Sequence, residues 1–329
     1  MKKRITIIEE SGAAAEVMEQ AVKILNAVGE QYDHHFEISR LAPDSPPSYF
    51  TSDDKSTIAQ SDAVLFSSDT AAKAIKEAFQ VFAIAQPVTV YHSLHHLSPL
   101  KNKYSDGVNL LIYQEPVAAA DEKSRQRIAQ SAFEQAAARK QKVTIVEPTN
   151  DGVTTAWQQI TAAFQKTYST IMVEQLSVEA AINKLLHHPA DFDIIITDTA
   201  AGNYLFLQAA ALSGTPAMIP SVLATETTSF FGPAFGCSTG APGKSQANPV
   251  GSILSVAMML NLFNMPEEAH IVRTAVNWTL LHGFVAKDID IVNNYSTSTI
   301  GDLVSDFIRG SIPGFAKGEN MALQKSTII

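Results

Sequence analysis

Three groups of histidines are the first residues in this sequence that could do chemistry, because imidazole is a common metal ligand. They are Asp33 with His34 and His35, His92 with His95 and His96, and His187 with His188. Adjacent histidines on an α-helix point about 100° apart, so such a pair seldom holds one ion. His187 and His188 precede Pro189 at an expected helix end, where imidazole can bond the last carbonyl groups. Because the groups lack ligand spacing, we expect satisfied surface or core histidines and no metal site there.

Three other features of the sequence do not indicate a phosphate site, a reactive thiol or a hydrolase. Gly243-Lys244-Ser245 matches the end of a phosphate-binding P-loop, but position 238 is Ser238 where the first glycine is needed. Cys237, the single cysteine, has no basic neighbour except Lys244, so we expect an inert small residue. The sequence has no Gly-x-Ser-x-Gly motif, which disfavours an α/β hydrolase.

Composition narrows the class of protein before any element is placed. The chain has 329 residues, 46% of them hydrophobic and 17% charged, which is typical of a globular protein of one large or two medium domains. A net charge of −9 disfavours a nucleic-acid or anionic-membrane partner. The longest apolar stretch, residues 253–265, is interrupted by Asn261 and Asn264 and is too short to span a bilayer. With no targeting segment visible at the start, we expect a cytoplasmic protein.

The elements that must position any site alternate along the chain. Short runs rich in Ile and Val predict strands at residues 4–8, 63–67, 88–92, 109–113, 143–146, 170–173 and 193–197. Between them, helical spacing places Val17, Ala21, Leu25 and Val28 on one face, and Val178, Ile182, Leu185 and Leu186 on another. This alternation predicts an α/β fold with both faces of the sheet covered.

The last third is different, because it is mostly helical. Asn248 has the chemistry of a helix N-cap and Pro249 that of a first helical residue. Residues 252–260 are nearly all apolar, which predicts a buried helix.

Several stretches resemble the isocitrate and 3-isopropylmalate dehydrogenase family. The main ones are residues 192–203, 211–221 and 244–260, and the supporting ones are Glu16-Val17 and residues 61–65, 98–101, 107–112 and 296–302. They occur in the family's order across almost the whole chain. The resemblance implies two α/β domains with a cleft between them, the first built from residues 1–82 and 214–329 and the second from residues 83–213. It also implies a homodimer.

The family's chemistry needs a divalent metal, a base and an acid, and arginines that hold the substrate's carboxylates. At the family's metal positions this sequence has Glu179, Asn203 and Leu207, and a hard cation prefers more than one carboxylate. The catalytic lysine position is Pro148, and no tyrosine stands between Pro116 and Arg127 where the family has one. The substrate arginine positions are Lys76, Gln86 and Gln114. We therefore name no catalytic residue.

The cofactor positions implied by the resemblance have changed as well. Phe235 replaces the family's histidine beside adenine, and Gly240 replaces the acid that holds the ribose, whereas Gly236 and Asn248 remain. Glu9 and Glu10 follow the first strand, where phosphates would approach. The retained positions also have structural explanations, so a preserved scaffold accounts for them. NAD and Mg²⁺ or Mn²⁺ are implied by the family, but the key ligands are lost.

Three hypotheses remain open. The first is a homodimeric family member that lacks the oxidative decarboxylation and binds a small molecule or a protein partner, with glutamines in place of arginines favouring a neutral ligand. The second is an active NAD-dependent dehydrogenase on an altered 2-hydroxy acid, whose metal site is rebuilt from Glu179, Asp198 and Asn203. The third is a subunit that works with a paralogous partner chain.

Overall fold

The structure is a computed structural model that describes residues 1–42, 49–116, 121–147, 156–237 and 245–311. Contacts divide the chain into two compact units. Unit 1 comprises residues 1–79, 215–222 and 226–329, and unit 2 comprises residues 80–214 and 223–225. That the two units act as separate domains stays a prediction. No helix in the described ranges is both long and apolar enough to cross a membrane.

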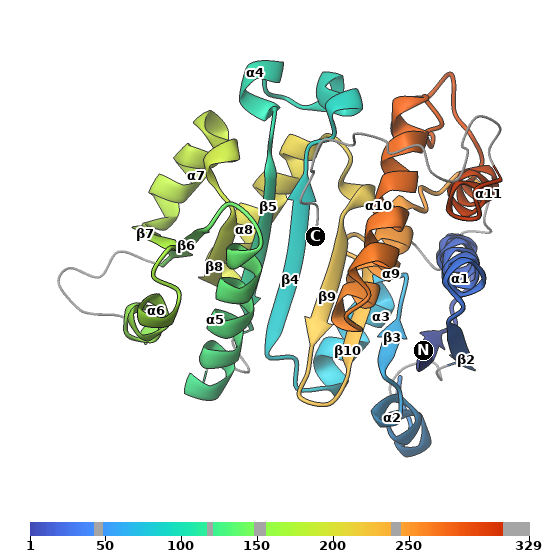
Figure 1. Cartoon of the computed structure of the whole chain (residues 1–329), viewed down its shortest axis with the longest axis horizontal. Helices are drawn as coiled ribbons and strands as arrows, with labels where there is room; N and C mark the ends of the chain where they lie inside the picture. Colours follow the sequence, from blue (N-terminus) through green and yellow to red (C-terminus); the bar gives the residue numbers. More distant parts are fainter. Residues whose placement is uncertain (43–48, 117–120, 148–155, 238–244, 312–329) are drawn as a thin grey trace. The chain divides into compact units, whose positions relative to one another are not determined.

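Unit 1 combines strands of the sheet with several helices (Figure 1). The helices contain most of its buried apolar residues. The strand order is β2-β1-β3-β10-β9, and β1 pairs in parallel with both β2 and β3. The strands are β1 (Lys2–Ile8), β2 (His35–Leu41), β3 (Ala63–Leu65), β9 (Pro220–Ala224) and β10 (Ser229–Pro233). The helices are α1 (Ala13–Tyr32), α2 (Ser52–Ala59), α3 (Asp69–Ala78), the short η4 (Pro216–Met218), α9 (Val250–Leu262), α10 (Pro266–Leu281) and α11 (Thr297–Ile308).

Unit 2 has the strand order β4-β5-β8-β6-β7, and it also takes the last residues of β9. The ladder of β4 and β5 is antiparallel, whereas β5, β8, β6 and β7 pair in parallel. The strands are β4 (Ala83–Thr89), β5 (Asn109–Glu115), β6 (Lys142–Val146), β7 (Met172–Leu176) and β8 (Ile194–Asp198). The helices are η1 (His92–Leu97), α4 (Asn102–Ser105), α5 (Glu122–Ala137), α6 (Ala156–Thr167), α7 (Val178–His187), η3 (Pro189–Asp191) and α8 (Thr199–Ser213).

The predicted α/β fold is confirmed, and several details of the sequence prediction are corrected. The strand expected at residues 88–92 is β4, which ends at Thr89, and His92 instead begins η1. Leu186, expected on the buried face of α7, is 45% exposed. Strands β2, β9 and β10 were not predicted.

Helix α9 is the buried helix that its apolar sequence predicts, since residues 250–260 are all buried. Its start is one residue later than expected, because Pro249 occupies the N-cap position and Val250 is the first helical residue. Asn248 nevertheless bonds the helix start, since its Oδ1 accepts a hydrogen bond of 3.0 Å from the Val250 amide. The side chain thus satisfies one of the amides that a helix N-terminus leaves unpaired.

Candidate functional site

Gln86 and Gln114, two of the three substrate positions implied by the resemblance, meet on one face of unit 2. In the β4–β5 ladder Gln86 faces Ile112 and Ile84 faces Gln114, so the two glutamines are diagonal neighbours. Gln114 Nε2 donates a hydrogen bond of 2.9 Å to Gln86 Oε1. Both side chains are buried, with exposed fractions of 8% and 2%. Two neutral amides therefore bond each other at these positions, and they offer no charge to a carboxylate.

The surroundings of the glutamine pair are filled by protein. Gly202 of α8 lies so close to Gln114 that a Cβ atom there would be 2.7 Å from Gln114 Cγ. Arg125, a cation that sequence reasoning missed, has its Nε 2.8 Å from Glu115 Oε1. Burial raises the pKa of Glu115, and the Arg125 ion pair opposes that rise. Glu115 follows Gln114 in β5, so this ion pair lies on the opposite face of the sheet from the glutamine pair. Arg125 is already matched by a buried carboxylate, which leaves it poorly suited to a second acid.

The positions considered for a metal lie on the two helices α7 and α8 of unit 2. Asp198 is the N-cap of α8, and its Oδ1 accepts a hydrogen bond of 2.8 Å from the Ala201 amide. Glu179 lies in the first turn of α7, where hydrogen bonds from its own backbone and from Ser177 lower its pKa. Asn203 and Leu207 are exposed on α8. Both carboxylates thus serve helix ends, and a metal site built from Glu179, Asp198 and Asn203 stays a prediction.

The remaining predicted positions lie in unit 1 or outside the described residues. Lys76 lies in the last turn of α3 in unit 1, and its role with substrate stays a prediction. Pro148, the family's lysine position, and Gly240, the ribose position, lie outside the described residues.

Unit 1 contains a cavity of about 170 Å³ at the start of α9. Asn248 lines it, and its Nδ2 donates to both carboxylate oxygens of Asp288 at 3.2 and 3.1 Å. Ser252 also lines the cavity and is only 3% exposed. Its buried hydroxyl has no hydrogen-bond partner among the described residues. The full lining is Ala217, Pro233, Phe235, Cys237, Gln246, Ala247, Asn248, Ser252 and Asp288. A buried, unused hydroxyl in a cavity is a polar group available to a ligand.

Several carboxylates lie near Cys237, one of the residues that line this cavity. Burial raises the pKa of Cys237 to about 11, and the charges of Asp69, Glu10, Asp288 and Glu16 add to the rise. At neutral pH the cysteine is therefore a thiol, as expected for an unreactive residue. The same field opposes an anion such as a phosphate.

Glu10 and Gly236 both lie against the start of α3. Glu10 accepts hydrogen bonds from the Ser67 amide at 3.3 Å, from the Ser67 hydroxyl at 3.0 Å and from the Ser68 hydroxyl. The Gly236 amide donates to Asp69 Oδ1 at 2.8 Å, and a Cβ on Gly236 would come within 2.2 Å of the Asp69 nitrogen. Close packing thus explains the retained Gly236, and a carboxylate already occupies the helix end that a phosphate would need.

The described residues fit the groups implied by the family poorly. A cavity of about 170 Å³ has room for one ring system, since sites for whole ligands start at about 300 Å³. Phe235, Asn248 and Ser252 suit such a ring, but the carboxylates around Cys237 oppose a pyrophosphate. For the metal, the carboxylates of Glu179 and Asp198 are already hydrogen-bonded locally. We therefore derive no reaction step through either group.

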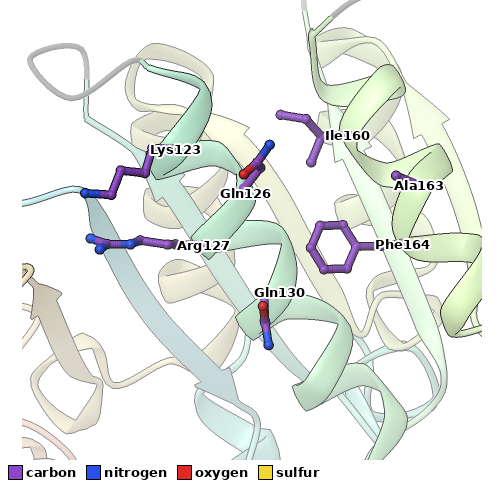
Figure 2. Close-up of a pocket in the computed structure, with 7 residues that line it drawn as sticks. All are labelled: Lys123, Gln126, Arg127, Gln130, Ile160, Ala163 and Phe164. Carbon is purple, nitrogen blue, oxygen red and sulfur yellow. The ribbon is translucent and has the colours of Figure 1, made fainter.

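A second hollow, of about 340 Å³, lies between α5 and α6 of unit 2 (Figure 2). Ile160 and Phe164 of α6 face α5, whereas Lys123 and Arg127 extend from α5 away from them. Arg127 lies over the Phe82 ring, with its guanidinium carbon 5.3 Å from the ring centre. The cations and the apolar surface thus do not converge on one ligand position.

One histidine group has ligand atoms close together, and the expectation that it is no metal site stays a prediction. In unit 2 ligand atoms of His92, His95 and Asp106 lie within 4.8 Å of one another. Sequence reasoning compared adjacent histidines on an α-helix, but the spacing of three residues between His92 and His95 suits the 3₁₀ turn that forms there.

The chain resembles known dehydrogenases along nearly all of its length. The family model described as isocitrate/isopropylmalate dehydrogenase matches residues 116–304. The 3-isopropylmalate dehydrogenase of Bacillus licheniformis is 30% identical over 336 residues, covering 88% of this chain and 91% of that protein. The enzyme of that name from Priestia megaterium is 29% identical over 341 residues, covering 90% and 92%.

Solved structures agree on the fold. The isocitrate dehydrogenase of Methylococcus capsulatus has a TM-score of 0.79 at 20% identity, covering 93% of this chain and 99% of that one. A β-decarboxylating dehydrogenase from Thermococcus kodakarensis has a TM-score of 0.76 at 22% identity, covering 93% and 96%. From the family match and the 30% identity over most of its length, the chain belongs to the isocitrate/isopropylmalate dehydrogenase family.

Proposed function

We propose that this chain is a family member that has lost the metal-dependent, NAD-linked oxidative decarboxylation and binds a small ligand in the cavity of unit 1. The observation that carries the first part is the buried hydrogen bond between Gln114 and Gln86. A hydroxy di- or tricarboxylate needs cations that can form charge-assisted, paired hydrogen bonds. Two neutral amides supply no charge, and one of their donors is already used in the bond between them.

The cavity supports the second part of the proposal and indicates the ligand class. The unpartnered Ser252 hydroxyl and the Asp288 carboxylate supply a donor and an acceptor, and Phe235 supplies an aromatic face. The carboxylates that raise the pKa of Cys237 favour a neutral or cationic ligand over an anion. The expected ligand is a neutral or cationic compound of about one ring system with hydrogen-bonding edges.

A second copy of this chain is the partner we propose. Helix α8 is apolar on its outer side as well as its inner side, since Tyr204 is 68% and Leu207 54% exposed. These residues are three positions apart and share a helix face, and exposed apolar faces of this kind are typical of subunit contacts. Light scattering on the purified chain tests the dimer, and Leu207→Glu is expected to yield a monomer. A monomeric wild type would contradict the homodimer.

An enzyme assay tests whether the chain has lost the oxidative decarboxylation. NADH formation is measured with NAD or NADP, Mn²⁺, and either 3-isopropylmalate or isocitrate, beside a 3-isopropylmalate dehydrogenase as the positive control. We expect no rate above the blank without protein. A metal-dependent rate within tenfold of the control enzyme would overturn the proposal.

The ligand class is tested separately by thermal shift. Neutral, cationic and anionic ring compounds of matched size are compared on the wild type and on Ser252→Met, whose longer side chain fills the cavity. Neutral or cationic compounds are expected to stabilise the wild type alone. Stabilisation mainly by anionic compounds, or equal stabilisation of Ser252→Met, would contradict the assignment.

An active dehydrogenase on an altered 2-hydroxy acid is the second candidate. The observation that favours it is the similarity to enzymes named 3-isopropylmalate dehydrogenase over 88% to 90% of the chain. It predicts that Glu179→Gln and Asp198→Asn each abolish Mn²⁺ binding. Because Asp198 caps α8, circular dichroism must first show that its variant folds. A regulatory role beside a paralogous chain predicts that this chain co-purifies with that chain from its natural source.

A further inference from the structure

The connection between β4 and β5 brings two distant stretches of unit 2 together. The β4–β5 ladder ends with Thr89 facing Asn109, and the Val90 amide then donates a 3.0 Å hydrogen bond to the Val108 carbonyl. The chain therefore leaves and re-enters the sheet at one point. His92 lies two residues after Val90, and Asp106 lies two residues before Val108. The elements η1 and α4 fill the connection, and Figure 1 shows α4 at the end of β5.

The 3₁₀ geometry of η1 places His92 and His95 on one side. With about three residues per turn, side chains three positions apart are eclipsed. The two imidazole ring centres are 4.9 Å apart. Helix η1 begins at His92, and the Leu94 amide donates to the Tyr91 carbonyl at 2.9 Å, which fixes this turn.

Asp106 supplies a third atom to the same point. It follows the last residue of α4, and its amide donates to the Asn102 carbonyl at 2.9 Å. Asp106 Oδ1 lies 4.0 Å from His92 Nδ1 and 3.9 Å from His95 Nε2. In a tetrahedral site with bonds of about 2.1 Å, two ligand atoms are about 3.4 Å apart. Because His92 and Asp106 are 84% and 71% exposed, small rotations of these two side chains can close the difference.

An independent observation concerns His95. Its side chain is only 5% exposed, and its Nε2 has no hydrogen-bond partner in the part of the chain that the structure describes. A buried polar atom without a partner is costly, and native proteins rarely leave one. Asp106 Oδ1 lies 3.9 Å from this nitrogen, so a cation between the two atoms would satisfy both.

We propose that His92, His95 and Asp106 bind a divalent transition-metal ion of the Zn²⁺ class. Two imidazole nitrogens and one carboxylate oxygen suit Zn²⁺ and its neighbours, whereas Mg²⁺ and Ca²⁺ prefer oxygen ligands alone. Three protein ligands leave one tetrahedral position for water or an exogenous ligand. None of the three residues is at a position where the resemblance places the dehydrogenase metal, so the site is separate from the proposed function.

Metal titration of the full chain, purified without a histidine tag, tests the site. Zn²⁺ is titrated by calorimetry, Co²⁺ is followed by its visible absorption, and Mg²⁺ serves as the comparison ion. We expect one equivalent of Zn²⁺, tetrahedral Co²⁺ absorption and no Mg²⁺ binding. His92→Ala and Asp106→Asn are each expected to weaken Zn²⁺ binding at least tenfold, and both residues are exposed enough for the variants to fold.

His96→Ala and Cys237→Ser are the matched controls. His96 is an exposed histidine next to His95, and Cys237 is the only thiol of the chain. Both variants are expected to bind Zn²⁺ within twofold of the wild type. The proposal is overturned by a wild type without saturable Zn²⁺ binding, by full binding in His92→Ala and Asp106→Asn, or by loss of binding in either control.

Discussion

The glutamine pair of unit 2 and the cavity of unit 1 carry positions that the family uses for binding, yet they differ in how their polar groups are satisfied. Gln86 and Gln114 bond each other and are packed against Gly202. In the cavity, Asn248 is bonded to Asp288, but the Ser252 hydroxyl has no partner within the described ranges and about 170 Å³ is open. The polar groups of the glutamine pair bond each other, whereas the cavity keeps a polar group and open space that a ligand could use.

This difference indicates which constraint acts on each region. Two buried side chains that bond each other contribute to the stability of the fold, because each lowers the free-energy cost of burying the other. A buried polar group without a partner has no such explanation and points to something that binds there. Stability should therefore respond strongly to changes in fully paired buried groups of unit 2, such as the glutamine pair, and weakly to changes in the cavity.

The largest effect is expected elsewhere in unit 2, at the buried ion pair of Arg139 and Asp193, where Arg139 also bonds Asn109 at the start of β5. Arg139 Nε lies 2.6 Å from Asp193 Oδ1, and the side chains are 2% and 0% exposed. Arg139→Ala leaves a buried carboxylate without its cation, which typically costs about 3–5 kcal/mol. Urea unfolding followed by circular dichroism measures the loss.

Arg309→Ala is the control for this prediction. Arg309 pairs with Glu30 at 2.7 Å, but the two side chains are 32% and 62% exposed. Exposed pairs contribute less than about 1 kcal/mol. Equal losses in the two variants would remove the argument that the buried paired groups of unit 2 are tightly constrained.

Within the two regions, Gln114→Ala and Ser252→Ala give a direct contrast. Gln114→Ala removes a buried hydrogen bond and leaves the Gln86 amide without this donor, which costs about 1–3 kcal/mol. Ser252→Ala removes a hydroxyl that has no partner among the described residues, so a change below about 0.5 kcal/mol is expected. If Ser252→Ala were the more damaging change in thermal unfolding, the contrast between the regions would fail.

A smaller effect concerns pH and the carboxylate near the cavity. Burial raises the pKa of Glu10 above its usual value, against hydrogen bonds from Ser68 and Ser67 that lower it. The folded state therefore holds the proton more tightly than the unfolded state. This stabilisation is complete below the usual pKa and is lost as the pH rises through the raised pKa.

Glu10→Gln cannot lose stability in this way, so its melting temperature relative to the wild type is expected to increase between pH 4 and pH 8. The same change is expected to lower the pKa of Cys237, because Glu10 helps to raise it. Melting curves and the pH dependence of thiol alkylation measure the two effects. A melting difference that does not change with pH would contradict a buried, hard-to-ionise Glu10.

Much of the fold could be predicted from local patterns. Helix α1 and strands β1, β5, β6 and β8 follow from apolar spacing, because their own residues form the core. Strand β10 could not be predicted, since its pairing with β3 joins residues more than 160 positions apart. Strand β4 was misplaced because Pro87 stands inside it, and proline is rare in a paired strand.

The candidate sites could be predicted only in part. The resemblance identified Gln86, Gln114 and Asn248, but no sequence pattern shows that the two glutamines bond each other. Ser252 was taken only as part of a buried apolar helix, and its open cavity depends on side chains from distant segments. For His92 and His95 the spacing was visible, and the missing information was the 3₁₀ turn and the return of the chain to Asp106.

The central claim is tested most directly by a thermal-shift titration with NADH, with and without Mn²⁺. A ligand at a hundred times its dissociation constant adds about 2.7 kcal/mol to the folded state. For a chain of this length that moves the unfolding midpoint by about 4 °C. The account predicts a cooperative transition with no shift from NADH under either condition. A clear shift with NADH, enlarged by Mn²⁺, would contradict it and support a working dehydrogenase.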